Sequence, residues 1–260
     1  MTSGIPSLAD EVLWRARRLM DPRTRPLRTP GLFVLGMHRS GTSCLTGLLE
    51  RAGLATGGTS RPHPHNRRGM FEQPDVRGAN RDILRRFGGS WSAPPARIPH
   101  AEIDPRAIRR ALEPFRRESR WVVKDPRMVL TLEAWLPHVR SFELVGTFRH
   151  PVAVARSLHA RNEIPFDDGQ ALWTHYNRRL VALHRRFAFP LIHFGDEADD
   201  YLASVRILFE RLSLRFDPAV ASFYEPGLVC QSAADDRALP EAESLYAYLF
   251  THRLRPDGLT

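Results

Sequence analysis

Cysteine is scarce in this chain of 260 residues. The two cysteines, Cys44 and Cys230, lie far apart and take part in no Cys-x-x-Cys or Cys/His pattern, which argues against a disulfide framework and a structural zinc site. No stretch approaches the roughly 20 apolar residues that a bilayer span needs, and the N-terminus carries acids and arginines where a signal peptide has an apolar core. We therefore expect no secretion, no stable membrane insertion and a location in the reducing cytoplasm.

Lysine is scarcer still. Lys124 is the only one, because every other residue among the 38 basic ones is arginine. Against 29 acidic residues the net charge is +9, which favours an anionic partner such as phosphate, sulfate, nucleic acid or an acidic membrane. A general preference for arginine does not explain the one lysine, so Lys124 is a candidate functional residue.

The apolar residues recur with two periods that alternate along the chain. Short apolar runs at 31–36, 142–148 and 190–194 predict buried strands, and the segment WVVKDPR at 121–127 begins as a β-branched strand that must stop before Pro126. Helical spacing predicts helices over 8–20, 42–52, 76–88, 104–118, 128–138, 168–187 and 199–212, with another after Pro151. This alternation predicts an α/β fold, a three-layer sandwich whose central, mostly parallel sheet is covered by helices on both faces. Ligands are expected outside the carboxyl ends of its strands.

No internal repeat of roughly 20–50 residues divides the chain, and we expect a single domain over 1–260. It comprises an N-terminal helix and linker at 1–30, a core at 31–215 and a C-terminal tail at 216–260. A stretch rich in Gly, Pro, His and Arg at 57–75 is too polar for the core and too long for a plain connector. We expect it to be an ordered functional loop.

The turn between the first core strand and its helix has the Gly-x4-Gly spacing of a phosphate loop. Its sequence is Gly36-Met37-His38-Arg39-Ser40-Gly41-Thr42-Ser43. The backbone N–H groups around Ser40 to Ser43 are expected to point at an anion at the helix N-terminus, and Gly41 permits close backbone approach. The simpler alternative is a tight turn capped by Ser or Thr.

Nucleotide triphosphatases carry lysine after the second glycine of such a loop, whereas this chain has Thr42 there and its cation is Arg39. A kinase using Mg-ATP would then need another cation and a metal-holding aspartate, for which Asp125 is the candidate.

A second basic turn follows the strand at 142–148. Arg149 ends that strand, and Ser157 lies about two turns along the next helix. An arginine and a hydroxyl at the carboxyl edge of the sheet are suited to grip a second phosphate, although a lone arginine there is more often part of a surface ion pair.

Together these segments resemble the sulfotransferase family that uses 3′-phosphoadenosine-5′-phosphosulfate (PAPS) as donor. The resemblance spans about residues 31–215. FVLGMHRSGTS is similar to the family's 5′-phosphosulfate loop, and FRHPVAVARS is similar to its 3′-phosphate motif. WVVKDPRM resembles a strand-end lysine segment of bacterial members, and LIHFGDEADD resembles the family's late strand and acidic turn.

The resemblance implies a P-loop-like fold and transfer of a sulfuryl group from PAPS to a hydroxyl or amine, leaving adenosine 3′,5′-bisphosphate, with no metal. It places His38, Arg39, Ser40, Gly41, Thr42, Ser43, Arg149 and Ser157 around the donor. The family's C-terminal Arg-Lys-Gly signature is absent, and Arg253 and Arg255 are candidates to replace it.

Four residues are predicted to be catalytic. Arg39 and Lys124 are expected to stabilise the charge that develops on the sulfuryl oxygens and the leaving phosphate. Glu72, in the segment GMFEQPD, is the first choice for the general base that takes the proton of the acceptor, and Asp125 is the second. The alternative for Lys124 is a solvated strand-end side chain, and for Asp125 an ion pair with Arg127 or Lys124.

Two other functions remain open at this point. One is a nucleotide or metabolite kinase, and the other is a non-catalytic module that binds anions or nucleic acid. The second is disfavoured because the arginines are dispersed and no recognised nucleic-acid motif is present. We therefore expect no nucleic-acid partner but a small-molecule or carbohydrate acceptor, whose identity the residues do not reveal. The terminal helices offer exposed faces through which a homodimer could form.

Overall fold

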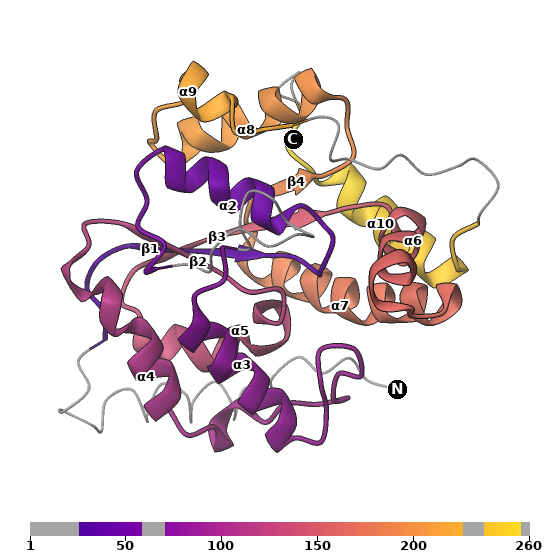
Figure 1. Cartoon of the computed structure of the whole chain (residues 1–260), viewed down its shortest axis with the longest axis horizontal. Coiled ribbons are helices and arrows are strands. Elements are labelled where there is room, and N and C mark those ends of the chain that lie inside the picture. The colour runs from indigo at the N-terminus through magenta and orange to yellow at the C-terminus, as the bar shows by residue number, and fades with distance from the viewer. Residues whose placement is uncertain (1–25, 59–70, 226–236, 256–260) are drawn as a thin grey trace. The chain divides into compact units, whose positions relative to one another are not determined.

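The structure is a computed structural model that describes residues 26–58, 71–225 and 237–255 (Figure 1). The helix predicted at 8–20 lies outside the described residues, as does most of the loop predicted at 57–75. The central element is a parallel sheet of four strands in the order β2-β1-β3-β4, flanked by helices. The predicted α/β fold is therefore confirmed.

All four predicted strands are present. They are β1 (Gly31–Leu35), β2 (Trp121–Lys124), β3 (Phe142–Phe148) and β4 (Leu191–His193). β3 pairs with β4 in the register Gly146 to Leu191, Thr147 to Ile192 and Phe148 to His193. Every residue of β1, β2 and β4 is buried, including Lys124 and His193 at the ends of β2 and β4, which explains why the other residues of these strands are apolar without alternation.

The helices are α2 (Thr42–Arg51), α3 (Pro74–Arg86), α4 (Arg106–Leu112), α5 (Met128–Trp135), α6 (Pro151–Asn162), α7 (Phe166–Phe187), α8 (Ala198–Arg211), α9 (Pro218–Ala221) and α10 (Pro240–Thr251). The helices from α2 to α8 follow the predicted order, whereas α9 and α10 lie in the segment that was expected to be a tail. Short 3₁₀ turns occur at His100–Glu102, Glu113–Arg117 and Leu136–His138. None of the helices in the described ranges is both long enough and apolar enough to cross a membrane.

Proline shortens two of the predicted helices. The helix expected over 104–118 ends at Leu112 and continues as a 3₁₀ turn, because Pro114 has no N–H to donate to the carbonyl of Arg110. The helix expected over 128–138 ends at Trp135 for the same reason, with Pro137 in the following turn.

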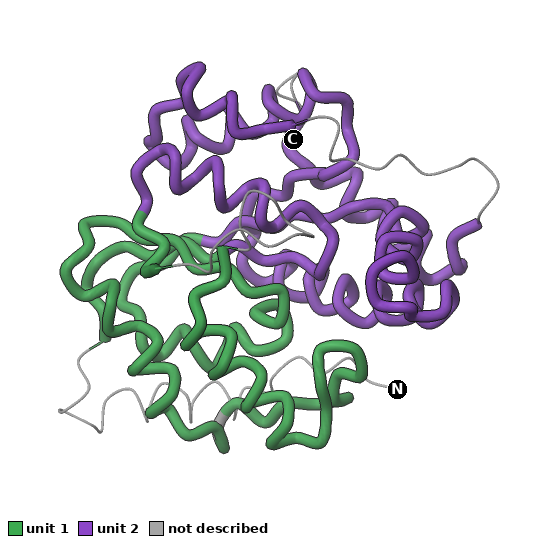
Figure 2. The backbone as a smooth tube through the Cα atoms, viewed as in Figure 1, with its two compact units in different colours: residues 1–33, 55–143 green, residues 34–54, 144–260 purple. Residues whose placement is uncertain are grey.

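The chain divides into two compact units, coloured separately in Figure 2. Unit 1 comprises residues 1–33 and 55–143. Its core is built around Trp121, whose ring stacks on Phe115 at 4.9 Å and meets Phe33 edge-on at 5.6 Å. A Cβ atom on Gly31 would lie 2.1 Å from the Trp121 ring, so glycine lets the strand approach it. The N–H of Val122 donates to the carbonyl of Ala55 at 2.9 Å.

Unit 2 comprises residues 34–54 and 144–260. Helices α6, α7 and α10 pack on one another in it (Figure 1). The segment expected as a C-terminal tail contributes α10, and beyond it the N–H of Leu254 donates to the carbonyl of Leu191 in β4 at 2.8 Å. The tail is thus part of the packed unit, while the single-domain organisation over 1–260 stays a prediction.

Candidate functional site

The predicted phosphate loop joins β1 to α2 in unit 2. Arg39 and Gly41 both have left-handed backbone conformations, with φ of 67° and 80°. The first intrahelical bond runs from the N–H of Leu45 to the carbonyl of Gly41 at 3.0 Å, and the N-cap residue Gly41 supplies no side-chain cap. The alternative of a turn capped by Ser or Thr is therefore wrong.

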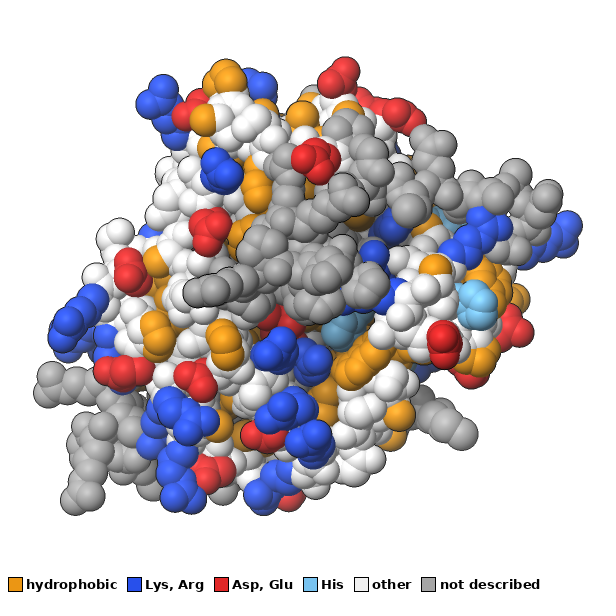
Figure 3. Space-filling view, in the orientation of Figure 1, with side chains coloured by type: hydrophobic (Ala, Val, Ile, Leu, Met, Phe, Trp, Pro, Cys, Tyr) orange, Lys and Arg blue, Asp and Glu red, His pale blue; other side chains and the backbone are white. Residues whose placement is uncertain are grey.

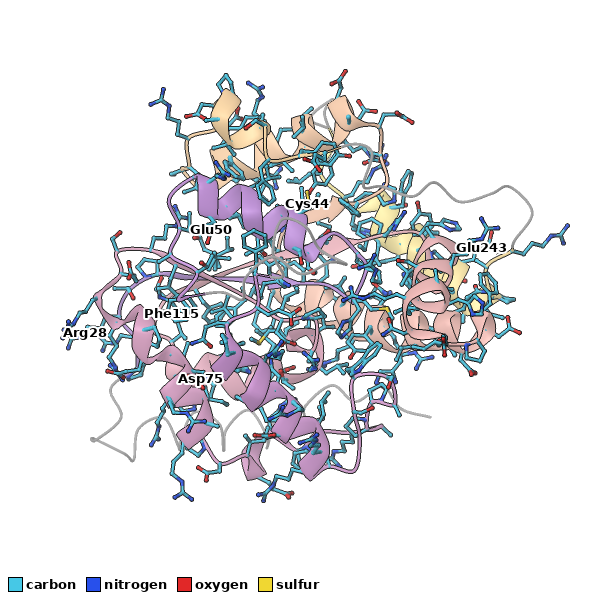
Figure 4. The ribbon with its side chains drawn as sticks, viewed as in Figure 1. Arg28, Cys44, Glu50, Asp75, Phe115 and Glu243 are labelled. Atoms are coloured by element: carbon cyan, nitrogen blue, oxygen red, sulfur yellow. The ribbon has the colours of Figure 1, made fainter. Side chains whose placement is uncertain are left out.

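The first turn of α2 carries no acidic residue, so the partial positive charge of the helix N-terminus is not neutralised there. Figure 4 labels Cys44 in this turn and Glu50 in the last turn of the same helix. The sulfur of Cys44 accepts a hydrogen bond from the hydroxyl of Tyr201 at 3.6 Å. The acid-free end of α2 is electrostatically suited to an anion.

Hydrogen bonds to β3 and within the loop fix the backbone of Ser40. Thr147 of β3 donates its hydroxyl to the carbonyl of Ser40 at 2.8 Å, and the N–H of Ser40 donates to the carbonyl of Met37 at 3.3 Å. Ser40 is fully buried, and its Oγ has no hydrogen-bond partner among the described residues. A buried hydroxyl without a partner is unfavourable, so this Oγ is a candidate ligand atom.

Gly41 has a second constraint besides its φ. A Cβ atom at this position would lie 2.2 Å from the ring of Phe194, which follows β4. We therefore expect Gly41→Ala to lower the free energy of unfolding by about 3 kcal/mol, from left-handed strain and overlap with the ring. Urea denaturation measures the change.

The matched control is Gly78→Ala in α3, where the added Cβ would meet nothing within 4 Å. Because alanine is the better helix former, this variant should gain about 0.5–1 kcal/mol. A Gly41→Ala variant as stable as the original protein would show that the loop does not have the described conformation.

Two of the residues predicted to bind PAPS contact each other in the structure. The Nε of Arg39 donates to the Oγ of Ser157 in α6 at 2.7 Å, across 118 residues of sequence. Sequence reasoning placed Arg39 at the 5′-phosphosulfate and Ser157 at the 3′-phosphate, without a contact between them. The two sequence motifs therefore meet in one place.

Arg149 lies directly after β3 and is only 5% exposed. Its carbonyl accepts a hydrogen bond from the indole Nε1 of Trp173 at 3.0 Å, and its guanidinium lies over the ring of Phe194, 5.9 Å from the centroid. A guanidinium can donate two parallel hydrogen bonds to a phosphate, so the type of side chain and its place after β3 suit an anion-binding role. His38 belongs to the phosphate loop, and its ring meets the ring of Tyr176 edge-on, with 6.1 Å between the centroids.

The other predicted catalytic residues lie in unit 1. Lys124 ends β2, and its side chain is 1% exposed, so the alternative of a solvated lysine is wrong. Its Nζ donates to Oε1 of Glu72 at 3.1 Å, and Glu72 is itself buried. Burial lowers the pKa of Lys124, and the carboxylate of Glu72 opposes that shift.

Asp125, the next residue, has a different partner. Its carboxylate is fully buried and accepts three hydrogen bonds from Arg127: from the backbone N–H at 2.8 Å and from Nη1 to both oxygens at 3.0 and 2.9 Å. Burial raises the pKa of Asp125, while the guanidinium of Arg127 acts in the opposite direction. This is the ion pair with Arg127 that the sequence offered as the alternative to a catalytic role.

Two residues around the loop were missed from the sequence. Thr147 was a detectable signal, because it is a polar residue in the otherwise apolar second half of the strand FELVGTF. Phe194 had none, because an aromatic residue after a strand usually belongs to the core.

Neither the known family models nor the curated proteins include a match to this chain. Among solved structures, it is similar to the sulfotransferase domain of the Synechococcus PCC 7002 olefin synthase, with a TM-score of 0.59 and 16% identity. The match covers 86% of this chain and 95% of that domain. The chain has a sulfotransferase-domain fold. This confirms the P-loop-like sulfotransferase fold that the sequence motifs predicted.

Two further structures are similar to parts of this sulfotransferase fold. One is sulfotransferase STF1 of Mycobacterium tuberculosis H37Rv, with a TM-score of 0.46, 17% identity and coverage of 83% of this chain and 75% of that one. The other is sulfotransferase STF9 of Mycobacterium avium, with a TM-score of 0.45, 15% identity and coverage of 81% and 71%.

Proposed function

We propose that this protein is a sulfotransferase that takes its sulfuryl group from PAPS. The observation that carries the proposal is the phosphate loop itself, in which the buried Oγ of Ser40 has no partner among the described residues. This loop precedes the acid-free N-terminus of α2 and contributes Arg39. A nucleotide with an anionic 5′ end would satisfy the hydroxyl, the helix N-terminus and the guanidinium at once.

The 3′-phosphate would be held by Arg149 and Ser157, with Arg39 linking the two ends of the donor through its hydrogen bond to Ser157. Two separate anionic groups on one nucleotide would explain why unit 2 places arginines after β1 and after β3. Arg253, one of the candidates for the missing C-terminal signature, lies against the ring of Phe250 and 3.9 Å from Asp196. Its role at the 3′-phosphate stays a prediction.

PAPS supplies an activated sulfuryl group. The acceptor oxygen or nitrogen attacks the sulfur, the bond from sulfur to the phosphate oxygen breaks, and adenosine 3′,5′-bisphosphate leaves. Arg39 and the loop N–H groups would stabilise the negative charge that moves onto the leaving phosphate. Glu72 would take the proton that the acceptor loses.

The pair of Glu72 and Lys124 suits that proton transfer. A carboxylate that gains a proton in a buried place loses its charge, and the neighbouring Nζ at 3.1 Å then becomes available to another negative oxygen. We propose that Lys124 is that charge-stabilising group. Asp125 is the weaker candidate for the base, because Arg127 already donates to both of its oxygens.

The same contact weakens the kinase alternative, since it occupies the aspartate that would have to hold Mg²⁺. The surface also gives little support to a nucleic-acid partner. On the face that Figure 3 shows, acidic side chains lie among the basic ones over α3, α4 and the 3₁₀ turn after α4. Arg110 of α4 pairs with Asp75 of α3 at 3.8 Å, and Arg116 pairs with Glu113 in the turn at 2.6 Å. A nucleic-acid interface presents a continuous basic surface instead.

Calorimetric titration tests the proposal before any acceptor is known. The purified protein should bind adenosine 3′,5′-bisphosphate without metal, at least about tenfold more tightly than Mg-ATP, a difference of about 1.4 kcal/mol. Binding of Mg-ATP alone, lost on chelation, would instead make the protein a kinase. Binding of generic RNA with steep salt dependence and no nucleotide affinity would favour the non-catalytic module.

Arg149 gives a prediction specific to the 3′-phosphate. Arg149→Ala should raise the Kd for adenosine 3′,5′-bisphosphate roughly tenfold to a hundredfold, because a charge-assisted contact is lost. Adenosine 5′-phosphosulfate, which lacks the 3′-phosphate, should lose much less affinity. Arg211→Ala, at the exposed end of α8, controls for the change in net charge. Equal losses for both ligands would argue against a 3′-phosphate role.

A further inference from the structure

The turn that follows β4 contacts both halves of the proposed donor site. Phe194 occupies the space where a side chain on Gly41 would be, and its ring also lies under the guanidinium of Arg149. Gly195 comes next, and a Cβ there would lie 3.3 Å from the ring of His193 and 3.9 Å from Cγ of Arg149. One aromatic ring therefore separates the loop after β1 from the arginine after β3.

The turn that carries Phe194 is closed by a side-chain contact between its ends. His193, the last residue of β4, and Asp196 meet through Nδ1 and Oδ1 at 2.6 Å, so Phe194 and Gly195 lie inside a four-residue loop. The N–H of Phe194 also donates to the carbonyl of Phe148 at 2.7 Å, which extends the pairing of β3 and β4 by one residue. Both the backbone and the side chains hold this turn.

A third residue holds the turn from α10. The hydroxyl of Tyr246 lies 3.1 Å from Nε2 of His193. The carboxylate oxygen of Asp196 accepts, so Nδ1 of His193 is the donor in that contact, and Nε2 is the ring atom that pairs with the hydroxyl of Tyr246. Burial and then Asp196 raise the pKa of Tyr246 to about 12, so its hydroxyl stays a donor. The ring of Tyr246 also meets His150, the neighbour of Arg149, at 4.7 Å.

We propose that Phe194 is a positioning residue for the donor site, and that the chain of Asp196, His193 and Tyr246 holds it in place. The ring keeps the backbone of the phosphate loop and the guanidinium of Arg149 at a fixed separation, so that both ends of one nucleotide can be bound together. This inference rests on the proposed function for its ligand, but the positions of the residues do not depend on that ligand.

The chain offers a closely matched control on the same helix. Tyr248 of α10 also pairs its hydroxyl with a histidine ring, at 3.0 Å from Nδ1 of His184 in α7. Tyr246→Phe and Tyr248→Phe each remove one hydroxyl and one contact with histidine, but only the first contact leads to Phe194. Tyr246→Phe should raise the Kd for adenosine 3′,5′-bisphosphate about fivefold, and Tyr248→Phe less than about twofold.

Phe194→Leu separates the two contacts of the ring. Leucine still fills space beside Gly41 but has no aromatic face for Arg149, so affinity for the bisphosphate should fall about tenfold. Affinity for adenosine 5′-monophosphate, which has no 3′-phosphate, should fall less than about threefold. Phe194→Tyr, which keeps the aromatic face, should restore most of the loss.

Hydrogen exchange in the ligand-free protein makes the test independent of the proposed function. Tyr246→Phe should speed exchange of the amides of residues 39–45 about fivefold, while Tyr248→Phe should leave them unchanged. If no nucleotide binds, the proposed function fails. The exchange rates still test whether Tyr246 holds the phosphate loop through His193 and Phe194. Equal behaviour of the two tyrosine variants in exchange and in affinity would overturn the inference.

Discussion

Glu72→Gln should leave the affinity for adenosine 3′,5′-bisphosphate within about twofold, while kcat falls by about a hundredfold or more, as the loss of a general base implies. Glutamine keeps an oxygen that can accept from Nζ of Lys124, so the buried lysine retains a hydrogen bond and the fold is disturbed little. Turnover is measured as release of the bisphosphate from PAPS, with the best acceptor from a screen of simple alcohols, phenols and amines.

Asp125→Asn is the comparison that makes this result specific. Since the carboxylate of Asp125 is bound to Arg127, we expect its replacement to lower the thermal midpoint of unfolding. The turnover number of the folded variant should change little. The opposite pattern, with Asp125→Asn nearly inactive and Glu72→Gln active, would move the base assignment to Asp125. Thermal midpoints of both variants identify any loss of activity that comes from unfolding.

Arg39→Ala should reduce kcat/KM for PAPS by about a hundredfold or more, because it removes a charged donor from the leaving phosphate. It also removes the hydrogen bond from Arg39 to Ser157, so the binding of the bisphosphate should weaken as well. Calorimetry and steady-state kinetics measure the two effects separately.

Two further variants show how much of the lost affinity and kcat/KM comes from the contact with Ser157 and how much from the shape of the guanidinium. Ser157→Ala removes the partner but leaves the guanidinium, and it should cost less than Arg39→Ala. Arg39→Lys keeps the positive charge but lacks the planar fork of donors, and it should recover only part of the loss. Unchanged kinetics in Arg39→Ala would refute the loop assignment.

Much of the fold could be predicted because its signals are local. The strand predicted at 142–148 has the same limits in the structure, since an apolar run that ends before Arg149 fixes both its type and its end. Helix starts were less certain. α3 begins at Pro74, two residues before the prediction, because Gln73 accepts from the N–H of Val76 and caps a turn that the apolar spacing does not show.

For the site, the sequence predicts which residues take part but not which of them are in contact. The Gly-x4-Gly loop marks Arg39 and Ser40, and the end of a buried strand marks Lys124. Which side chains meet depends on packing between distant segments, and no local pattern contains that information. The pairing of Lys124 with Glu72 across 52 residues and the ring of Phe194 beside Gly41 are both of this kind.

The backbone at Ala55 hydrogen-bonds to β2, and the backbone at Leu254 hydrogen-bonds to β4. These bonds limit the ways in which two copies of the protein can associate. β2 and β4 are the outer strands of the sheet, and outer strands carry backbone groups with which another molecule can pair. Here Ala55 accepts from Val122 on one side, and Leu254 donates to Leu191 on the other, so the chain partly covers both borders with its own backbone. A homodimer of this protein should therefore assemble through helical faces rather than by extending its sheet into a second copy.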